Sequence, residues 1–198
     1  MKLTVVGCGD AFGSGGRLQT CYHVETSQTR FVIDCGATTL IGFNKLGIDP
    51  NTVETIFISH LHGDHFAGLV WWLVHAQHVA KRTSPSPVVG PEGVRARFEA
   101  AAEALFPGST GIQRRYDLRY LEMTREKPMD VGSVRVTPFE VKHPCGAPPY
   151  ALRFETRRQG AELQRRHGVD RHARSNRTRG RSLHHGMLPL RRMRRAST

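Results

Sequence analysis

Apolar and polar residues follow two different patterns along the first 156 residues of the chain. Short apolar runs, bounded by glycine, proline and polar residues, predict β-strands at residues 2–6, 20–25, 30–33, 55–58, 88–91, 119–123, 133–141 and 150–156. We expect the first of these to be buried and the second and third to form a hairpin. Apolar residues three or four positions apart predict helices at residues 38–46, 66–74 and 92–106, the first of them ending at Gly47. Helices that alternate with strands in this way are typical of a layered α/β domain.

The densest group of ligand-type side chains follows the predicted strand at residues 55–58. It consists of His60, His62, Asp64 and His65, within six consecutive positions. In an extended loop, His60 and His62 project to the same side because side chains alternate. If the chain then enters a helix, Asp64 and His65 can face a second metal position, a few ångströms from the one that His60 and His62 face. Such an arrangement suits two metal ions that share one water. Imidazole and carboxylate ligands favour zinc ahead of manganese or iron. The alternative to a metal site is a histidine-rich loop that binds no metal.

A glycine-rich segment, residues 7–16, follows the first predicted strand. Its backbone amides offer a possible cradle for a phosphate, but no P-loop or dinucleotide-binding fingerprint fits it. We interpret the segment as a tight turn at the rim of the site.

Length and cysteine content narrow the class of protein. A chain of 198 residues suits one domain with one core. The four cysteines, Cys8, Cys21, Cys35 and Cys145, have no paired spacing, which predicts reduced thiols. We recognise no signal peptide and no apolar run of membrane-spanning length, so we expect a cytoplasmic protein without a membrane partner.

The net charge of +12 is concentrated at one end of the chain. Residues 1–156 carry 16 Lys and Arg against 15 Asp and Glu, whereas residues 157–198 carry 13 against 2. The predicted domain is therefore almost neutral, and its composition gives only weak support for RNA as a partner.

The segment Ser59-His60-Leu61-His62-Gly63-Asp64-His65 resembles the HxHxDH motif of the metallo-β-lactamase superfamily, and most of all its ribonuclease Z branch. The resemblance covers residues 1–156 and implies an αββα sandwich, in which two mixed sheets pack face to face with helices outside. It also implies a hydrolase in which two zinc ions activate a water molecule.

The same resemblance assigns roles to individual residues. His143, which follows the predicted strand at residues 133–141, would complete a three-histidine metal site with His60 and His62. Asp64 would bind metal together with His65 and would orient the attacking water, which makes it the candidate catalytic residue. For Asp34, at the end of the strand at residues 30–33, two roles stay open: support of the metal loop by hydrogen bonding, or the N-cap of the next helix.

The resemblance ends after residue 156. Members of the superfamily continue with a Ser-Gly-Asp-Thr type turn, whose aspartate bridges both metals, and with a last histidine ligand, and we recognise neither of them here. The fold is therefore expected to be incomplete in its C-terminal half and to hold at most about one zinc tightly, judged from the number of ligands. A sheet left uncovered in this way predicts low solubility or a homodimer.

Residues 157–198 form an arginine-rich tail in which no strand or helix pattern is recognisable. Three interpretations stay open: an RNA-binding arm, a disordered terminus, and a segment translated out of frame. The third can be examined with the genetic code, because residues 163–167 can be encoded CTA CAG CGG CGA CAC. Read one base later, these codons give Tyr-Ser-Gly-Asp-Thr, which is the missing turn.

For the substrate, the ribonuclease Z resemblance implies a phosphodiester of the kind found in the 3′ trailer of precursor tRNA. The sequence has no long basic insertion between Gly90 and His143 that would serve as an arm for gripping tRNA. A small-molecule phosphodiesterase and a lactone or thioester hydrolase therefore stay open, as does a catalytically impaired product that lacks the bridging aspartate and the last histidine.

Overall fold

The computed structural model describes residues 1–158 and 161–163. Its first sheet has the strand order β1-β2-β3-β4-β5-β6. The bounds are β1 (Lys2–Gly7), β2 (Cys21–Glu25), β3 (Arg30–Ile33), β4 (Thr55–Phe57), β5 (Ser86–Gly90) and β6 (Leu118–Glu122). The first three strands pair antiparallel and the last four pair parallel, so this sheet is mixed, and the expected hairpin is β2–β3.

The second sheet has the order β10-β9-β8-β7, with β7 (Met129–Val131), β8 (Val134–Glu140), β9 (Tyr150–Arg158) and β10 (Ala161–Leu163). All of its described strands pair antiparallel, so the expectation of a second mixed sheet is wrong for this part of the chain. The sequence pattern also missed β7, because three residues are too few to show a period.

Strand structure continues past residue 156, where we expect the domain to end. Strand β9 continues to Arg158, and residues 161–163 pair with it as β10. No strand pattern is recognisable in the sequence at these positions, but an antiparallel neighbour supplies backbone hydrogen bonds whatever the side-chain pattern. The rest of the predicted tail lies outside the described residues.

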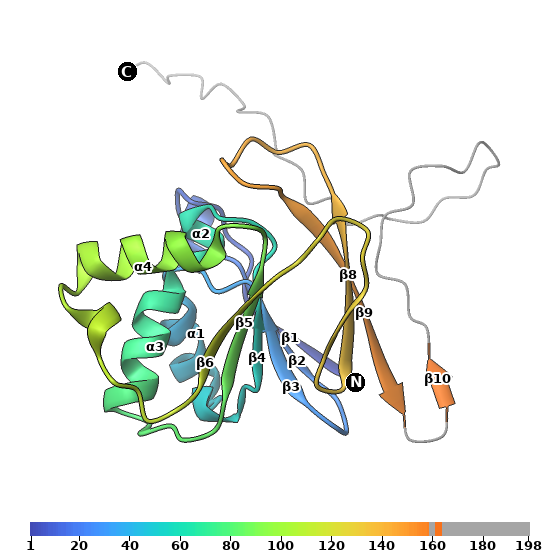
Figure 1. The fold of residues 1–198 in the computed structure, drawn as a ribbon, viewed down its shortest axis with the longest axis horizontal. Coiled ribbons are helices and arrows are strands. Elements are labelled where there is room, and N and C mark those ends of the chain that lie inside the picture. Colours follow the sequence, from blue (N-terminus) through green and yellow to red (C-terminus); the bar gives the residue numbers. More distant parts are fainter. Residues whose placement is uncertain (159–160, 164–198) are drawn as a thin grey trace, which may run out of the picture. The chain divides into compact units, whose positions relative to one another are not determined.

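Helices cover one face of the first sheet, and the second sheet lies against its other face (Figure 1). The α-helices are α1 (Thr39–Leu46), α2 (Gly63–Phe66), α3 (Gly68–His78) and α4 (Val94–Leu105), and short 3₁₀ turns are η1 (Ser14–Gly16), η2 (Pro50–Thr52) and η3 (Ser109–Gly111). The predicted stop of the first helix is confirmed, because Gly47 adopts φ 63°, a left-handed conformation that glycine accepts without strain. The helix predicted after the metal loop is divided into α2 and α3. None of the described helices has the length and hydropathy that a membrane-spanning helix requires.

The core has two layers, one on each face of the first sheet. Trp72 and Phe43 fill the helix side, with ring centroids 5.1 Å apart. Between the sheets, Phe31 and Phe57 pack against Phe154 at centroid distances of 5.1 and 5.0 Å. Each fully buried aromatic side chain contributes about 1.5–3 kcal/mol through removal from water, so these layers hold the sheets in a fixed relation.

Strand β1 departs from the prediction of a buried strand. Leu3 and Val5 are each 53% exposed, although Leu3 pairs with Val24, which belongs to the core between the sheets. Paired residues lie on the same face, so these two side chains belong to the inner face of the first sheet. No described strand of the second sheet covers that part of the face.

Candidate metal centre

The candidate metal loop leaves the middle of the first sheet. Strand β4 pairs on both sides, and the amide of Ile58 continues the pairing by donating to the carbonyl of Val89 at 2.8 Å. Beyond it, Leu61 turns into the core with 3% exposure, while its neighbours His60 and His62 turn the other way. The alternation expected from the sequence is therefore present, and a buried leucine anchors it.

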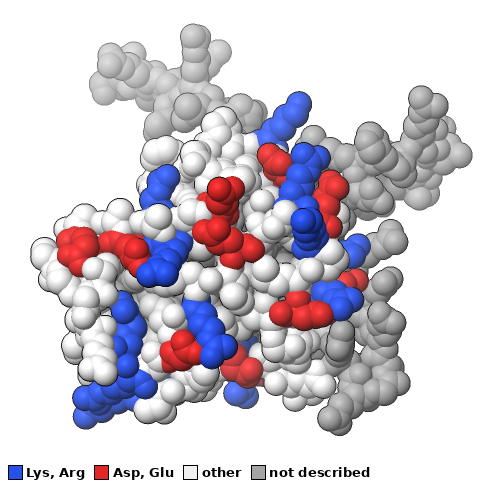
Figure 2. Space-filling model, in the orientation of Figure 1, with Lys and Arg blue, Asp and Glu red and all other residues white. Residues whose placement is uncertain are grey.

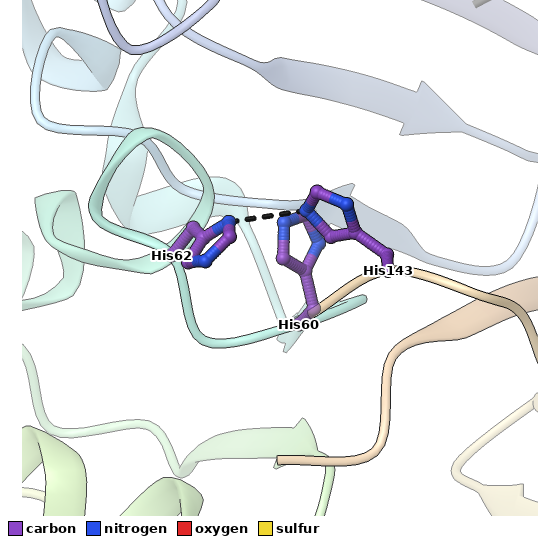
Figure 3. A group of neighbouring side chains, drawn as sticks. All are labelled: His60, His62 and His143. Carbon is purple, nitrogen blue, oxygen red and sulfur yellow. Dashed lines mark hydrogen bonds between the residues drawn. The ribbon is translucent and has the colours of Figure 1, made fainter. Parts of the chain in front are cut away.

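Three of the predicted ligands meet in one cluster. Ring nitrogens of His60, His62 and His143 lie within 4.8 Å of one another, and Nε2 of His143 lies 3.1 Å from Nδ1 of His62 (Figure 3). The loop that carries His143 is held in place from both ends. The amide of Val141 donates to Pro149 at 3.0 Å, and the amide of Tyr150 donates to the carbonyl of Ser59 at 3.0 Å.

The protonation of His60 follows from its hydrogen-bond partners. Ser59 Oγ lies 3.0 Å from Asp34 Oδ2. An ionised carboxylate has no proton to donate, so the Ser59 hydroxyl is the donor of this hydrogen bond. The same oxygen, 3.0 Å from His60 Nδ1, then accepts the Nδ1 proton. His60 Nε2 therefore carries a lone pair, and it is buried with no hydrogen-bond partner in the described chain. Burial, with a smaller effect of His65, lowers the pKa of His60 to about 4, so this lone pair stays free at neutral pH.

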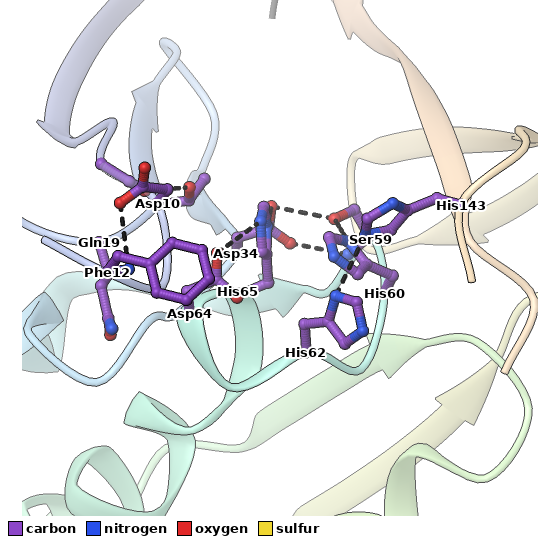
Figure 4. A network of polar contacts seen from close by, with 12 residues as sticks. Asp10, Phe12, Gln19, Asp34, Ser59, His60, His62, Asp64, His65 and His143 are labelled. Atoms are coloured by element: carbon purple, nitrogen blue, oxygen red, sulfur yellow. Dashed lines mark hydrogen bonds and ion pairs between the residues drawn. The ribbon is translucent and has the colours of Figure 1, made fainter. Parts of the chain in front are cut away.

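The remaining predicted residues form a second group beside the first. His65 Nδ1 lies 2.7 Å from Asp34 Oδ2, and its Nε2 lies 3.5 Å from Asp64 Oδ2 (Figure 4). Burial works to lower the pKa of His65, but the hydrogen bond to Asp34 and the charges of Asp34 and Asp64 outweigh it and raise this pKa. Two carboxylates thus favour positive charge at His65. The rings of His60 and His65 are 4.0 Å apart between centroids, so the two groups adjoin.

The structure decides between the two roles left open for Asp34. Its carboxylate is buried and accepts from Ser59 N at 2.8 Å, from the Ser59 hydroxyl and from His65, whereas the residue at the N-cap of α1 is Thr38. Asp34 therefore supports the metal loop. It does so with φ 61°, a left-handed conformation that aspartate tolerates better than most residues.

Close backbone packing fixes the metal loop against the turn that follows Asp34. The amide of Cys35 donates to the carbonyl of His65 at 2.6 Å, and the amide of Gly68 donates to Cys35 at 2.8 Å. A Cβ at Gly68 would lie 2.1 Å from the carbonyl oxygen of Gly36, and a Cβ at Gly36 would lie 2.4 Å from that of Asp64. Only glycine fits at these two positions.

The sequence interpretation missed two parts of this arrangement. Ser59 links Asp34 to His60, and the only sequence signal for that role is a hydroxyl directly before the first histidine. The contact between Gly36 and Gly68 has no sequence signal, because each glycine is unremarkable until the fold brings them together.

The donor set fits divalent metal ions. Three imidazoles provide the cluster, and a carboxylate and a fourth imidazole lie beside it, which is a typical arrangement for zinc and related ions. The buried, unpartnered Nε2 of His60 is the specific observation, because an imidazole lone pair without a partner is costly unless a cation or a proton meets it.

Comparison with known proteins places the chain in a family. The family model described as Anti-Pycsar protein Apyc1 matches residues 1–160. Among curated relatives, Ribonuclease BN of Citrobacter koseri is 32% identical over 125 residues, which are 63% of this chain and 38% of that protein. Ribonuclease Z of Methanococcus maripaludis is 31% identical over 156 residues, which are 77% of this chain and 49% of that protein. The chain thus spans about half the length, or less, of these two relatives.

Solved structures show the same fold. The crystal structure of the short form of human tRNase Z superposes with a TM-score of 0.60 at 23% identity, over 82% of this chain and 67% of that one. The metallo-β-lactamase fold protein YhfI of Bacillus subtilis gives 0.56 at 19% identity, over 77% and 57%. The predicted metallo-β-lactamase fold is therefore confirmed.

Proposed function

Because the chain belongs to the family described as Anti-Pycsar protein Apyc1 and has the metallo-β-lactamase fold, we propose that it is a metal-dependent hydrolase of phosphodiesters, most similar to ribonuclease Z. One observation carries the proposal: the lone pair of His60 Nε2, set by Ser59 and Asp34, faces the nitrogens of His62 and His143.

Each residue of the centre has a proposed task. His60, His62 and His143 would hold the first divalent ion, and Asp64 and His65 would contribute to a second. When bound, such ions supply a water of lowered pKa and neutralise the negative charge that develops on the phosphoryl oxygens. Asp64 would orient that water and hold its proton, because its carboxylate lies 3.5 Å from His65 Nε2, the nitrogen that would bind the second ion.

We propose zinc as the ion because imidazole and carboxylate ligands suit it best. The four cysteines are free, which agrees with the reducing conditions of the cytoplasm that we propose as the location. The uncovered Leu3 and Val5 support the proposal of a homodimer, which sedimentation of the purified chain would test.

Among phosphodiesters, the described surface favours a small substrate over tRNA. Acidic and basic side chains are interspersed on the face seen in Figure 2, and no continuous basic surface appears there. Strong RNA binding depends on clustered Lys and Arg, whereas residues 1–156 carry almost as many Asp and Glu (15) as Lys and Arg (16). A small-molecule phosphodiesterase is therefore our second candidate, and the arginine-rich residues beyond 163 keep RNA as an alternative.

The test is turnover by the metal-loaded protein on bis(p-nitrophenyl) phosphate and on a simple lactone. We expect hydrolysis of the phosphodiester that is lost in His60→Ala, with His78→Ala, an exposed histidine in α3, as the matched control. Hydrolysis of the lactone alone would contradict the proposal. If the chain is impaired by the departure after residue 156, a version with the shifted reading frame should be more active on the same substrate.

A further inference from the structure

Phe12 is the most exposed large apolar side chain in the described part of the protein, with 91% of its surface accessible. One exposed apolar side chain is ordinary on a protein surface. Phe12 differs from the others in two respects: its loop is held in one conformation, and the loop is attached to the metal centre.

Hydrogen bonds within the loop fix the backbone at Phe12. Asp10 Oδ1 accepts from the amides of Phe12 and Ser14, each at 3.1 Å. The amide of Gly13 donates to the carbonyl of Asp10 at 3.3 Å, and the amide of Gly16 donates to that of Gly13 at 2.9 Å. Gly13, with φ 67°, makes this turn possible. An exposed ring on a fixed backbone loses little freedom when a ligand covers it.

The base of the loop is attached to the segment that supports the metal loop. The amide of Gly9 donates to Leu18 at 2.7 Å, which closes the loop. Next along the chain, Gln19 Oε1 accepts from Ala37 at 2.8 Å, and its Cβ touches Gly36, the residue packed on the carbonyl of Asp64. In Figure 4 the phenyl ring projects toward the side of the site where Asp64 and His65 lie.

We propose that Phe12 is a substrate-binding residue, whose ring stacks on the planar base of a nucleotide while the phosphate occupies the metal centre. The inference rests on the proposed function, because it requires the phosphate to bind there. Stacking of a base on an aromatic side chain strengthens binding by about tenfold. The nearby Gly13 and Gly16 add no side chains to this loop, and an added Cβ at either would meet nothing within 4 Å.

The test compares two ligands that differ only in the base. Adenosine 5′-monophosphate and ribose 5-phosphate are titrated into the zinc-loaded full chain by calorimetry. We expect the unsubstituted protein to bind the nucleotide about tenfold more tightly than the sugar phosphate. Phe12→Ala should remove that difference and leave the affinity for ribose 5-phosphate unchanged, whereas Phe12→Trp should keep it. Val79→Ala, at a side chain 68% exposed after α3, is the matched control and should change neither affinity.

The outcomes separate this inference from the proposed function. If ribose 5-phosphate binds and the nucleotide binds no better, the role of Phe12 is refuted while the phosphate site stands. Equal weakening of both ligands by Phe12→Ala would also refute it, because stacking acts on the base alone. If neither ligand binds, the proposed phosphodiester function is wrong, and the role of Phe12 falls with it.

Discussion

Substitution of Asp34 tests whether the metal centre depends on the residues that orient its histidines. Asp34→Asn keeps the size of the side chain and tolerates the left-handed backbone. The asparagine side chain, however, has an NH₂ donor in place of one carboxylate oxygen. In the first orientation this NH₂ faces the backbone N–H of Ser59, and in the second it faces the Ser59 hydroxyl and His65 Nδ1. In the second orientation His65 must accept at Nδ1 and carry its proton on Nε2, the nitrogen that faces Asp64. A protonated Nε2 cannot bind a metal.

The magnitudes follow from the three hydrogen bonds that the carboxylate accepts. Substitutions of residues that orient metal ligands usually weaken metal binding about 10- to 100-fold, and we expect that range for Asp34→Asn. Its stability loss should be about 1–2 kcal/mol, because one donor loses its partner. Asp34→Ala removes the acceptor of three part-buried donors and places alanine at φ 61°, so a loss of about 4 kcal/mol is expected. Asp34→Gly separates the contributions, since it loses the same hydrogen bonds without the backbone strain.

Zinc affinity is measured by competition with a fluorescent chelator, stability by urea unfolding of the apo protein, and the His65 tautomer by nitrogen chemical shifts. The reasoning is refuted if Asp34→Asn is folded, keeps the original His65 tautomer and binds zinc within twofold of the unsubstituted protein. Equal stability of the Asp34→Ala and Asp34→Gly variants would refute the contribution assigned to the backbone.

Four further predictions concern other parts of the molecule. Gly68→Ala should prevent stable folding or lower stability by several kcal/mol, because its Cβ would lie 2.1 Å from the carbonyl oxygen of Gly36. A urea midpoint equal to that of the original protein would show that the segments of Gly36 and Gly68 can move apart. Metal analysis after dialysis should find at most about one zinc per chain, and none after His143→Ala; two retained ions would contradict this ligand count. At pH 8, iodoacetamide should label the exposed Cys8 long before the buried Cys35. Burial raises the pKa of Cys35 to about 12, so roughly one in ten thousand of its thiols is ionised at that pH. Equal labelling rates would indicate that the core opens readily. Resequencing of the gene near codon 157 should reveal a one-base shift that restores the Tyr-Ser-Gly-Asp-Thr turn, and an early stop codon in that frame would rule the shift out.

Local patterns were sufficient for much of the fold. The metal motif follows β4 as predicted, the hairpin β2–β3 is present, and α1 ends at Gly47, because alternation, helical period and a glycine stop are properties of neighbouring residues. The short β7 and the pairing of residues 161–163 were not predictable, since each depends on a strand that is its neighbour only in space.

The same division applies to the metal centre. The sequence by itself determined which side chains can bind a metal: the motif alone singles out His60, His62 and His65 with their spacing. Only the tertiary structure decided how they are oriented. It brings His143 from 81 positions away to within 3.1 Å of His62, and it sets the free lone pair of His60 through Asp34. The physical reason is that metal coordination depends on the direction of the ligands' lone pairs. Hydrogen bonds and backbone contacts fix that direction, and the segments that make them meet only when the two sheets and their loops are packed.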